Sequence, residues 1–472
     1  MALLSGDPYG LWYSNTALPV DGLSPQIPAR LPQSIFYDSI GWGIFNTSIV
    51  DGTRNVSVGM HAGTYGSAHQ HDDQNSITVN AYGDKLLIDS GYYDYFGSRH
   101  FEQYSIKTRA HNTILVDQQS QNGRKDGAGA EMTRFFDNRS FGYMTGEAGN
   151  PTLNGGKLEQ FERRVLFVKP EFIITHDVIK ANQPVELAYL AHSSYPLFAS
   201  SPRRYFDIIG EKAELYARVL APKEVTFSIS TGYDVEPVRP RGNNEWLEES
   251  VVVREYHLAA ALPEKVSQAD FLVAMQIRPQ PVTRDSRAKI TDVECAAGRA
   301  FRAVKADKSV VIGASRLSDG ELAVDGLSTD GTLAAARLDA QGNVLCAIAA
   351  DATVLKFGDK VLATASEPGM LTFPADDLEA VNAVDSLQLS VGGADRSFEG
   401  VRVKRAADWL TYYSGSFECG EETVEVTIPG TDVHLISDMV PIPGTVADGK
   451  THFSWTPGSG AHFLVISISE SL

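Results

Sequence analysis

Cysteine is scarce in this chain, which has only Cys295, Cys346 and Cys419 among 472 residues. The three lie far apart and form no Cys-x-x-Cys pair, so neither a disulfide framework nor a thiolate zinc site is indicated. Long apolar runs are also missing, and the first residues have neither a basic region nor a sustained apolar stretch. We therefore expect no membrane-spanning segment and no signal peptide in the chain as written.

Basic residues are in short supply as well. Lys and Arg number 41 against 59 Asp and Glu, which gives a formal net charge of -18. A chain this acidic has no bulk attraction for nucleic acid or for an anionic membrane. Local charge differs, since Arg99, Lys107 and Arg109 follow one another closely. These residues form either an anion-binding face or a solvated basic edge.

Helical periodicity is scarce after the first residues. Short β-branched and aromatic runs recur instead between Gly, Asn and Asp clusters, as at 76–79, 113–116 and 271–277. Runs of this length and composition are typical of strands in half-buried sheets. The pattern predicts an all-β fold, with a large antiparallel two-layer β-sandwich followed by a smaller β-rich C-terminal region.

Composition divides the chain into four segments. A proline-rich lead-in covers 1–33, and a large β-sandwich that contains the candidate site covers 34–282. A second part of the sandwich, at 283–366, is rich in Asp-Gly pairs, which are hairpin signals. The last segment, 367–472, is predicted to form a small C-terminal β domain.

The candidate site is a cluster of metal-ligand side chains in the first third of the chain. His69 and His71 are two residues apart, so they project from the same face if the segment is extended. Two imidazoles and one carboxylate suit Zn²⁺ and leave a fourth position for water or another group. We predict that His71, Asp89 and His111 hold a structural Zn²⁺, with another divalent metal as the alternative. His69 would then face a bound substrate, and Asp73 would orient an imidazole through its second nitrogen.

Three motifs in this order resemble the β domain of the heparinase II/III-like polysaccharide lyases, which carries H-G-H-A-D-Q-L-S, D-P-G-T-Y and A-H-N-T. In this chain they read His69-Gln70-His71-Asp72-Asp73-Gln74-Asn75-Ser76, Asp89-Ser90-Gly91-Tyr92-Tyr93 and Ala110-His111-Asn112-Thr113. The positions of His71, Asp89 and His111 resemble the family's structural zinc set, and that of His69 resembles an active-site histidine. Gln70 and Ser90 replace a glycine and a proline, and neither is a ligand position.

The resemblance implies β-elimination on a uronic-acid-containing polysaccharide. That reaction needs neutralisation of the sugar carboxylate, a base for the C5 proton and an acid for the departing oxygen. The catalytic candidates are His69, Tyr95 and Arg109, and the substrate-binding candidates are Asn112 and Arg99.

The resemblance also implies partners and a location. Family members place a helical toroid before the β domain, and the toroid usually supplies a catalytic tyrosine. The lead-in at 1–33 resembles the tail of such a region or a linker. The expected partners are an acidic polysaccharide or oligosaccharide, a toroid in trans and a second copy in a homodimer, with no nucleic acid and no membrane. The expected location is periplasmic or secreted.

Two other classes of function are compatible with parts of the pattern. Gly63, His69, His71 and Gly83 match the first motif of cupins, but Ser76 stands where the glutamate ligand is expected. A cupin-type dioxygenase or isomerase therefore has an incomplete ligand set. A non-catalytic carbohydrate-binding or scaffold β-sandwich derived from a lyase is the stronger alternative, because a fold does not fix an activity.

Overall fold

A computed structural model describes residues 33–49, 51–64, 69–91, 94, 96–123, 125–237, 255–283, 286–374, 380–391, 394–404, 408–438 and 440–471. The chain separates into a larger unit, made of Ser34–Thr47 and Thr53–Asp376, and a smaller unit that contains the segment from Asp377 to Leu472. Antiparallel strands make up nearly all of the regular structure, which confirms the all-β prediction. Among the described residues, no helix combines the length and apolar character needed to cross a bilayer.

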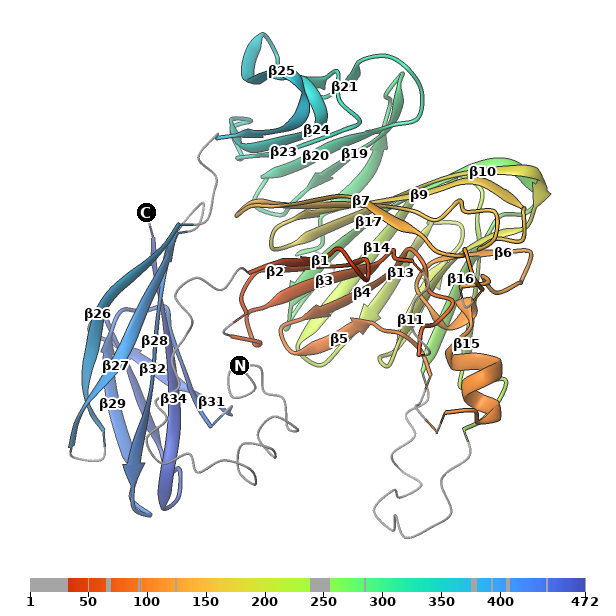
Figure 1. The fold of residues 1–472 in the computed structure, drawn as a ribbon. Helices are drawn as coiled ribbons and strands as arrows, with labels where there is room; N and C mark the ends of the chain where they lie inside the picture. Colours follow the sequence, from red (N-terminus) through yellow and green to blue (C-terminus); the bar gives the residue numbers. More distant parts are fainter. Residues whose placement is uncertain are drawn as a thin grey trace. The chain divides into compact units, whose positions relative to one another are not determined.

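The larger unit is a stack of three β layers (Figure 1). The first layer contains two sheets. One has the order β1 (Ile35–Tyr37), β2 (Trp42–Asn46), β3 (Val56–His61), β4 (Ser76–Ala81) and β5 (Asp84–Leu87). The other has the order β15 (Thr226–Thr231), β16 (Tyr256–Ala261), β11 (Leu187–Ser193) and β6 (Ile114–Val116).

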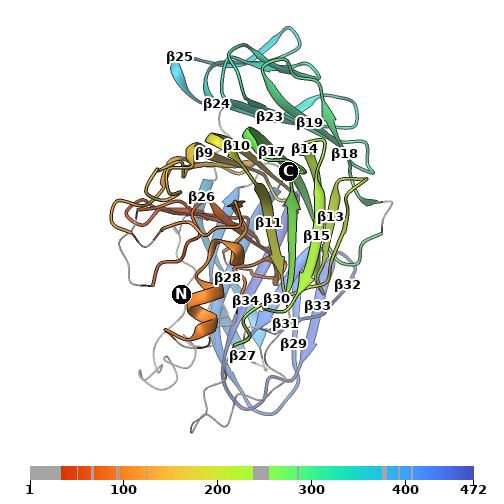
Figure 2. The same ribbon diagram turned by 90° about the vertical axis from the view of Figure 1, so that its right-hand side faces the viewer.

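The middle and outer layers are eight-stranded and seven-stranded along their main paths. The middle sheet has the order β12 (Leu197–Ser200), β13 (Tyr205–Ile209), β14 (Ala213–Ala221), β17 (Val266–Pro279), β10 (Phe172–Val185), β9 (Leu158–Val168), β8 (Phe141–Glu147) and β7 (Glu131–Asp137). The outer sheet has the order β18 (Lys289–Val293), β19 (Gly298–Val304), β20 (Val310–Arg316), β23 (Leu333–Leu338), β24 (Val344–Phe357), β22 (Leu327–Thr329) and β21 (Leu322–Val324), with β25 (Lys360–Phe373) paired to β24. Figure 2 shows this outer sheet, in teal, beyond β9, β10 and β17.

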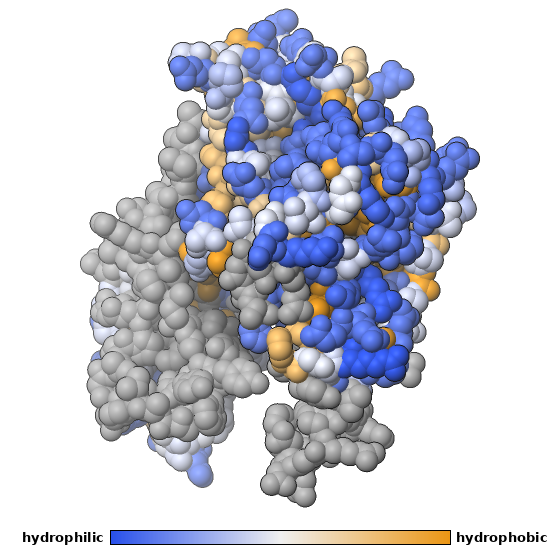
Figure 3. Space-filling model, turned by 45° about the vertical axis from the view of Figure 1, so that its right-hand side comes forward, coloured by the Kyte–Doolittle hydropathy of each residue, from blue (hydrophilic) through white to orange (hydrophobic). Residues whose placement is uncertain are grey.

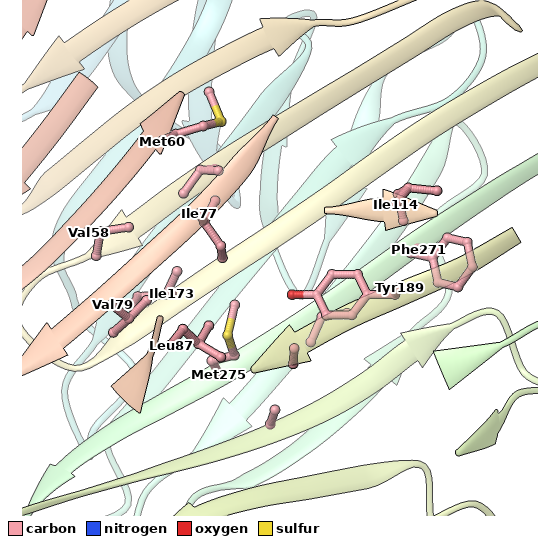
Figure 4. Packing of buried hydrophobic residues seen from close by; sticks show 14 of the residues in the cluster. Val58, Met60, Ile77, Val79, Leu87, Ile114, Ile173, Tyr189, Phe271 and Met275 are labelled. Carbon is pink, nitrogen blue, oxygen red and sulfur yellow. The ribbon is translucent and has the colours of Figure 1, made fainter. Parts of the chain in front are cut away.

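The middle sheet is buried on both faces, which is where the structure departs from the two-layer prediction. On β10, Ile173 packs into the core shared with the first layer, whereas Phe172 and Ile174 pack into the core shared with the outer layer. Figure 4 shows Ile173 in the first of these cores, together with Met60 of β3 and Met275 of β17. A strand covered on both faces needs apolar residues at successive positions. The apolar run in β17 therefore reflects a central strand that is covered on both faces.

Two short helical elements connect β5 to β6. These are the π-helical turn η1 (Phe101–Ser105) and the 3₁₀ turn η2 (Thr108–Ala110). They carry the chain from the end of one first-layer sheet to the start of the other. The connection matters for function because the second and third sequence motifs lie at its two ends.

The smaller unit has its own core, in which Phe398, Phe417 and Leu464 are buried. Its six-stranded sheet has the order β26 (Ala380–Val391), β27 (Ala394–Lys404), β28 (Asp408–Cys419), β34 (Gly460–Ser471), β30 (Val433–Ser437) and β31 (Val440–Ile442). Its three-stranded sheet has the order β29 (Val424–Pro429), β33 (Lys450–Trp455) and β32 (Gly444–Ala447).

The four predicted segments map unevenly onto these units. The segments 34–282 and 283–366 lie in one unit, with their junction between β17 and β18, and the junction at 367 falls within β25. Of the predicted lead-in 1–33, all but residue 33 lies outside the described residues. The face of the protein in Figure 3 is mostly hydrophilic with scattered apolar residues, as expected when the apolar side chains fill the cores between layers.

Candidate functional site

The three sequence motifs meet at one end of the first layer. The histidine-rich motif lies in the connection between β3 and β4, whose ends are joined by the pairing of His61 with Ser76. Asp89 comes two residues after β5, and His111 follows η2 directly. His69 and His71 therefore lie on a loop and not on the extended segment that the sequence predicted.

Buried polar side chains hold the β3–β4 loop in place. Asp72 accepts hydrogen bonds from the Ser120 hydroxyl at 3.0 Å and from the Gly123 backbone amide at 3.0 Å. Gln74 accepts one from the Gly63 amide at 2.8 Å. Each of these contacts ties the loop to a neighbouring segment of the chain. A loop fixed in this way presents its histidines at defined positions.

Asn75 fixes the start of β4 by a close approach to the next layer. Its backbone has φ of 60°, and its side-chain amide donates to the carbonyls of Gly146 at 3.1 Å and Phe161 at 3.0 Å. A Cβ at Gly146 would lie 2.2 Å from the Asn75 side-chain oxygen. Glycine is therefore required on β8 for the loop to reach this position.

The three predicted metal ligands come together. His111 Nδ1 lies 3.0 Å from Asp89 Oδ1, and the rings of His71 and His111 have centroids 5.3 Å apart. Burial disfavours the charged form of His111, but the negative charges of Asp89, Asp73 and Asp72 outweigh burial and raise its pKa. Within the described ranges, no three His, Cys, Asp or Glu side chains are already arranged to hold a metal ion. Zinc binding by this set therefore stays a prediction.

An open cleft of about 500 Å³ lies beside these residues. His69 is exposed at its edge, with its ring 5.2 Å from that of Phe96. The residues that line the cleft are Ser39, Ile40, Trp42, His61, Thr64, His69, Gln70, His71, Asp73 and Asp89. The cleft thus contains three histidines and two carboxylates.

His61 lies outside the sequence motifs, but the structure places it in the cleft. Its Nδ1 lies 2.9 Å from Asp73 Oδ1, and its ring stacks on that of Trp42 with centroids 4.9 Å apart. Burial raises the pKa of Asp73, but the hydrogen bond with His61 and the nearby histidine charges outweigh burial and lower it. The signal in the sequence was Asp73, for which an imidazole partner was expected without the partner being identified.

Asn112 and Arg163 form the scaffold behind the cleft. Asn112 is fully buried, and its amide donates to the carbonyls of Ile77 and Ile88, both at 2.8 Å, while accepting from the His192 amide at 2.8 Å. Arg163 is also fully buried, and it donates to Asp177 as well as to the carbonyls of Asn75 and Asn112. Asn112, predicted to bind substrate, is thus part of the scaffold: its amide is bonded to the backbone, and it does not line the cleft.

The two predicted arginines do not line the cleft. Arg109 forms an ion pair with Asp234 at 2.6 Å and donates to the Gln103 carbonyl at 2.9 Å. Arg99 is exposed and donates to the Gln103 side chain at 3.2 Å. Tyr95 lies outside the described residues. Closeness in sequence to the histidines therefore did not bring the two arginines into the cleft.

A second polar cluster fixes the segment that follows Asp89. Glu255 accepts hydrogen bonds from the Ser90 hydroxyl at 2.6 Å and from the Gly91 amide at 2.9 Å. The Tyr104 hydroxyl lies 2.8 Å from that of Ser90, and burial raises the pKa of Tyr104 above its ordinary value. A buried phenol of raised pKa stays neutral. The hydrogen bonds of this cluster hold Ser90 and Gly91, and they therefore fix the chain directly after Asp89.

Comparisons with known proteins agree with the motifs. The family model described as "Heparinase II/III-like, C-terminal" matches residues 29–285. A comparison with curated proteins found no match.

Several solved lyases match this chain at low identity. Heparan sulfate lyase HepC from Pedobacter heparinus is 14% identical with a TM-score of 0.50, over 68% of this chain and 47% of that one. Heparinase III is 12% identical with a TM-score of 0.49, over 67% and 49%. The Paenibacillus xanthan lyase is 11% identical with a TM-score of 0.34, over 92% and 50%.

At these identities the likeness to HepC shows a shared fold and no more. This chain spans about half the length of each of these lyases. The family model, in contrast, covers more than half of this chain and includes all three motifs. The chain therefore belongs to the heparinase II/III-like family, whose C-terminal domain it contains.

Proposed function

We propose that this protein is a polysaccharide lyase that cleaves uronic-acid-containing chains by β-elimination. One observation carries the proposal: residues of the first two family motifs line a single open cleft of about 500 Å³, and His111 of the third motif lies against Asp89 and His71 of that lining. Such a cleft can take sugar units of a chain that passes through it, because it is open to solvent. Ionisable groups gathered in a cleft are also the usual mark of a catalytic site.

The chemistry of the cleft suits an acidic sugar. The C5 proton of a uronate lies next to a carboxylate and is only weakly acidic, so its removal requires neutralisation of that carboxylate and a base. Imidazole serves both needs, since it donates a hydrogen bond to an anion and accepts a proton near neutral pH. We assign His69, exposed at the cleft edge, to the sugar carboxylate.

A structural Zn²⁺ is part of the proposal. His71, Asp89 and His111 would hold it, and its role would be to link the β3–β4 loop to the segments before and after the helical turns. The donor set suits zinc, and His111 Nδ1 and Asp89 Oδ1 lie 3.0 Å apart, which is close enough for one ion to contact both.

The partners expected from the family remain part of this proposal. They are an acidic polysaccharide, a helical toroid domain in trans and a second copy of the chain. The matched part of this chain spans about half the length of these lyases, so the activity of a whole lyase is proposed and not carried over from them.

Elimination leaves an unsaturated uronate that absorbs in the near ultraviolet, and this provides the test. The protein is incubated separately with alginate, heparan sulfate, chondroitin sulfate and hyaluronan, and absorbance is followed over time. We expect turnover of at least one of these chains and loss of turnover in His69→Ala. Retention of a polysaccharide without any unsaturated product would instead favour the carbohydrate-binding alternative.

A further inference from the structure

We propose that His61, oriented by Asp73 and Trp42, is the general base of this cleft. The inference rests on the proposed lyase function and goes beyond it, because it assigns proton removal to a residue outside the three family motifs. His61 is the last residue of β3, eight positions before His69. It lines the same cleft as His69 and Asp89.

Two contacts fix the ring of His61. Asp73 Oδ1 lies 2.9 Å from Nδ1, and both side chains are more than nine-tenths buried. Trp42, the direct partner of His61 in the β2–β3 pairing, stacks on the ring with an interplanar angle of 13°. A hydrogen bond in the plane of the ring and a stacked neighbour above it leave the imidazole little freedom to rotate.

The same contacts set the tautomer. A carboxylate only accepts hydrogen bonds, so the proton of neutral His61 resides on Nδ1, and Nε2 carries the lone pair. Nε2 makes no hydrogen bond with any described residue, and His61 lines the cleft. An imidazole oriented by a carboxylate through one nitrogen and open through the other is the arrangement used for general bases.

His69 is less suited to the same task. It is exposed, and it lies on the loop rather than at the end of a paired strand. Proton transfer depends on a fixed donor–acceptor geometry, whereas contact with a charged carboxylate tolerates more freedom. The two histidines therefore divide the work, with His69 on the sugar carboxylate and His61 on the C5 proton.

The elimination step balances with these groups alone. The C5–H bond breaks and its proton passes to His61 Nε2, while the electron pair of that bond forms the C4=C5 double bond. The C4–O4 bond breaks, and the departing oxygen receives the proton back from Nε2. His61 ends in its starting state, and the products are an unsaturated uronate and a free hydroxyl.

The test compares three variants in the absorbance assay on the four polysaccharides. His61→Gln keeps an amide beside Asp73 but has no basic nitrogen, and we expect kcat to fall by about 100- to 10,000-fold with KM little changed. Asp73→Asn replaces a carboxylate, which only accepts hydrogen bonds, with an amide that can also donate; the tautomer of His61 is then no longer fixed, and kcat should also fall. His176→Gln is the matched control: His176 is buried and lies 3.5 Å from Asp270, but it is not part of the cleft, and wild-type turnover is expected.

Chemical rescue separates a base from a structural residue. His61→Ala leaves a gap that opens onto the cleft, so added imidazole should restore part of the lost rate in this variant. It should have no such effect on His69→Ala. A merely structural role for His61 would give no rescue.

The outcomes distinguish this inference from the proposed function. An active wild type whose His61→Gln variant keeps at least about a tenth of its kcat overturns the inference and leaves the lyase function standing. If His61→Gln does not fold, Asp73→Asn decides by the same criterion. A wild type that forms no unsaturated product on any of the four substrates overturns the proposed function, and this inference with it.

Discussion

At the scale of single residues, the site contains two groups with different tasks. His61, His69 and His71 line the cleft, where a ligand can reach them. Asn112 and Arg163 are fully buried and hold the backbone from which the site is built. Substitutions in the first group should change metal binding or turnover, whereas those in the second should change stability.

Replacing His71 tests the proposed set of zinc ligands. His71→Ala removes one of three proposed ligands, so we expect zinc content to fall from about one ion per chain to near zero and the melting temperature to drop. His69→Ala is the control, since it alters a neighbouring imidazole and should retain the metal. Elemental analysis of both purified variants provides the measurement. Equal zinc content in the two would contradict the assignment of His71.

Replacing Arg163 tests the buried scaffold. Arg163→Met leaves Asp177 as an unpaired buried charge and frees the carbonyls of Asn75 and Asn112, so we expect a loss of about 3–5 kcal/mol in the free energy of unfolding.

The matched control for Arg163 is Arg134→Met. Arg134 pairs with Asp351 at 3.0 Å, and half of its side chain is exposed, so its loss should cost less than about 1 kcal/mol. Urea unfolding of both variants measures the difference. Similar losses in the two would show that Arg163 does not carry the scaffold.

At the scale of elements, the position of each site residue follows from strand ends. His61 ends β3, Asp89 follows β5, and His111 precedes β6. Because strands of one layer are held at fixed spacing by their hydrogen bonds, the loops at their ends are held together too. The strength of this arrangement depends on how firmly the first layer packs on the middle sheet.

Replacing Ile173 tests that packing. Ile173 is fully buried on β10, in the core shared with the first layer, and Ile173→Ala should cost about 2–5 kcal/mol because it leaves a cavity there. Ile229 on β15 is the control, since 42% of its surface is exposed and its replacement by Ala should have little effect. Chemical denaturation of each variant gives the two values. A loss in Ile229→Ala as large as that in Ile173→Ala would argue against the three-layer core as the source of stability.

At the scale of the whole protein, polar contacts also join the layers of the larger unit. Asp270 of β17 accepts two hydrogen bonds from Arg299 of β19, both at 2.7 Å, and lies 3.5 Å from His176 Nε2. Burial raises the pKa of Asp270, but the hydrogen bonds from Arg299 and His176 outweigh burial and lower it to about 2. The ionised carboxylate is therefore favoured in the folded state.

This depressed pKa predicts a loss of stability in acid. An unfolded Asp titrates near 3.8, so the contribution of Asp270 is complete above about pH 4 and is lost as the pH falls toward 2. The difference between the two pKa values corresponds to about 2 kcal/mol. Urea unfolding at several pH values should show that Asp270→Asn is less stable at pH ~5 but loses about 2 kcal/mol less than wild type on acidification. Parallel pH profiles for the two proteins would contradict the prediction.

Much of the site was accessible from the sequence because motif residues are local. The spacing of His69, His71, Asp89 and His111 identified the cluster, and the structure brings these residues to one end of a layer. The recurring short β-branched and aromatic runs likewise identified the all-β class. Both signals are carried by neighbours along the chain, which is the range over which a sequence pattern is informative.

Only the tertiary structure determined which distant residues meet. The pairing of β2 with β3 brings Trp42 to His61, and the return of the β3–β4 loop brings Asp73 to the same imidazole. The third layer is a further example of what the sequence left open. The apolar run in β17 is compatible with a strand that is covered on one face or on both faces. The sequence by itself determined the strand class and the family motifs, because these depend on local residue order. Long-range packing decided which layers pack together and which residues meet at the cleft, and no local pattern encodes such packing.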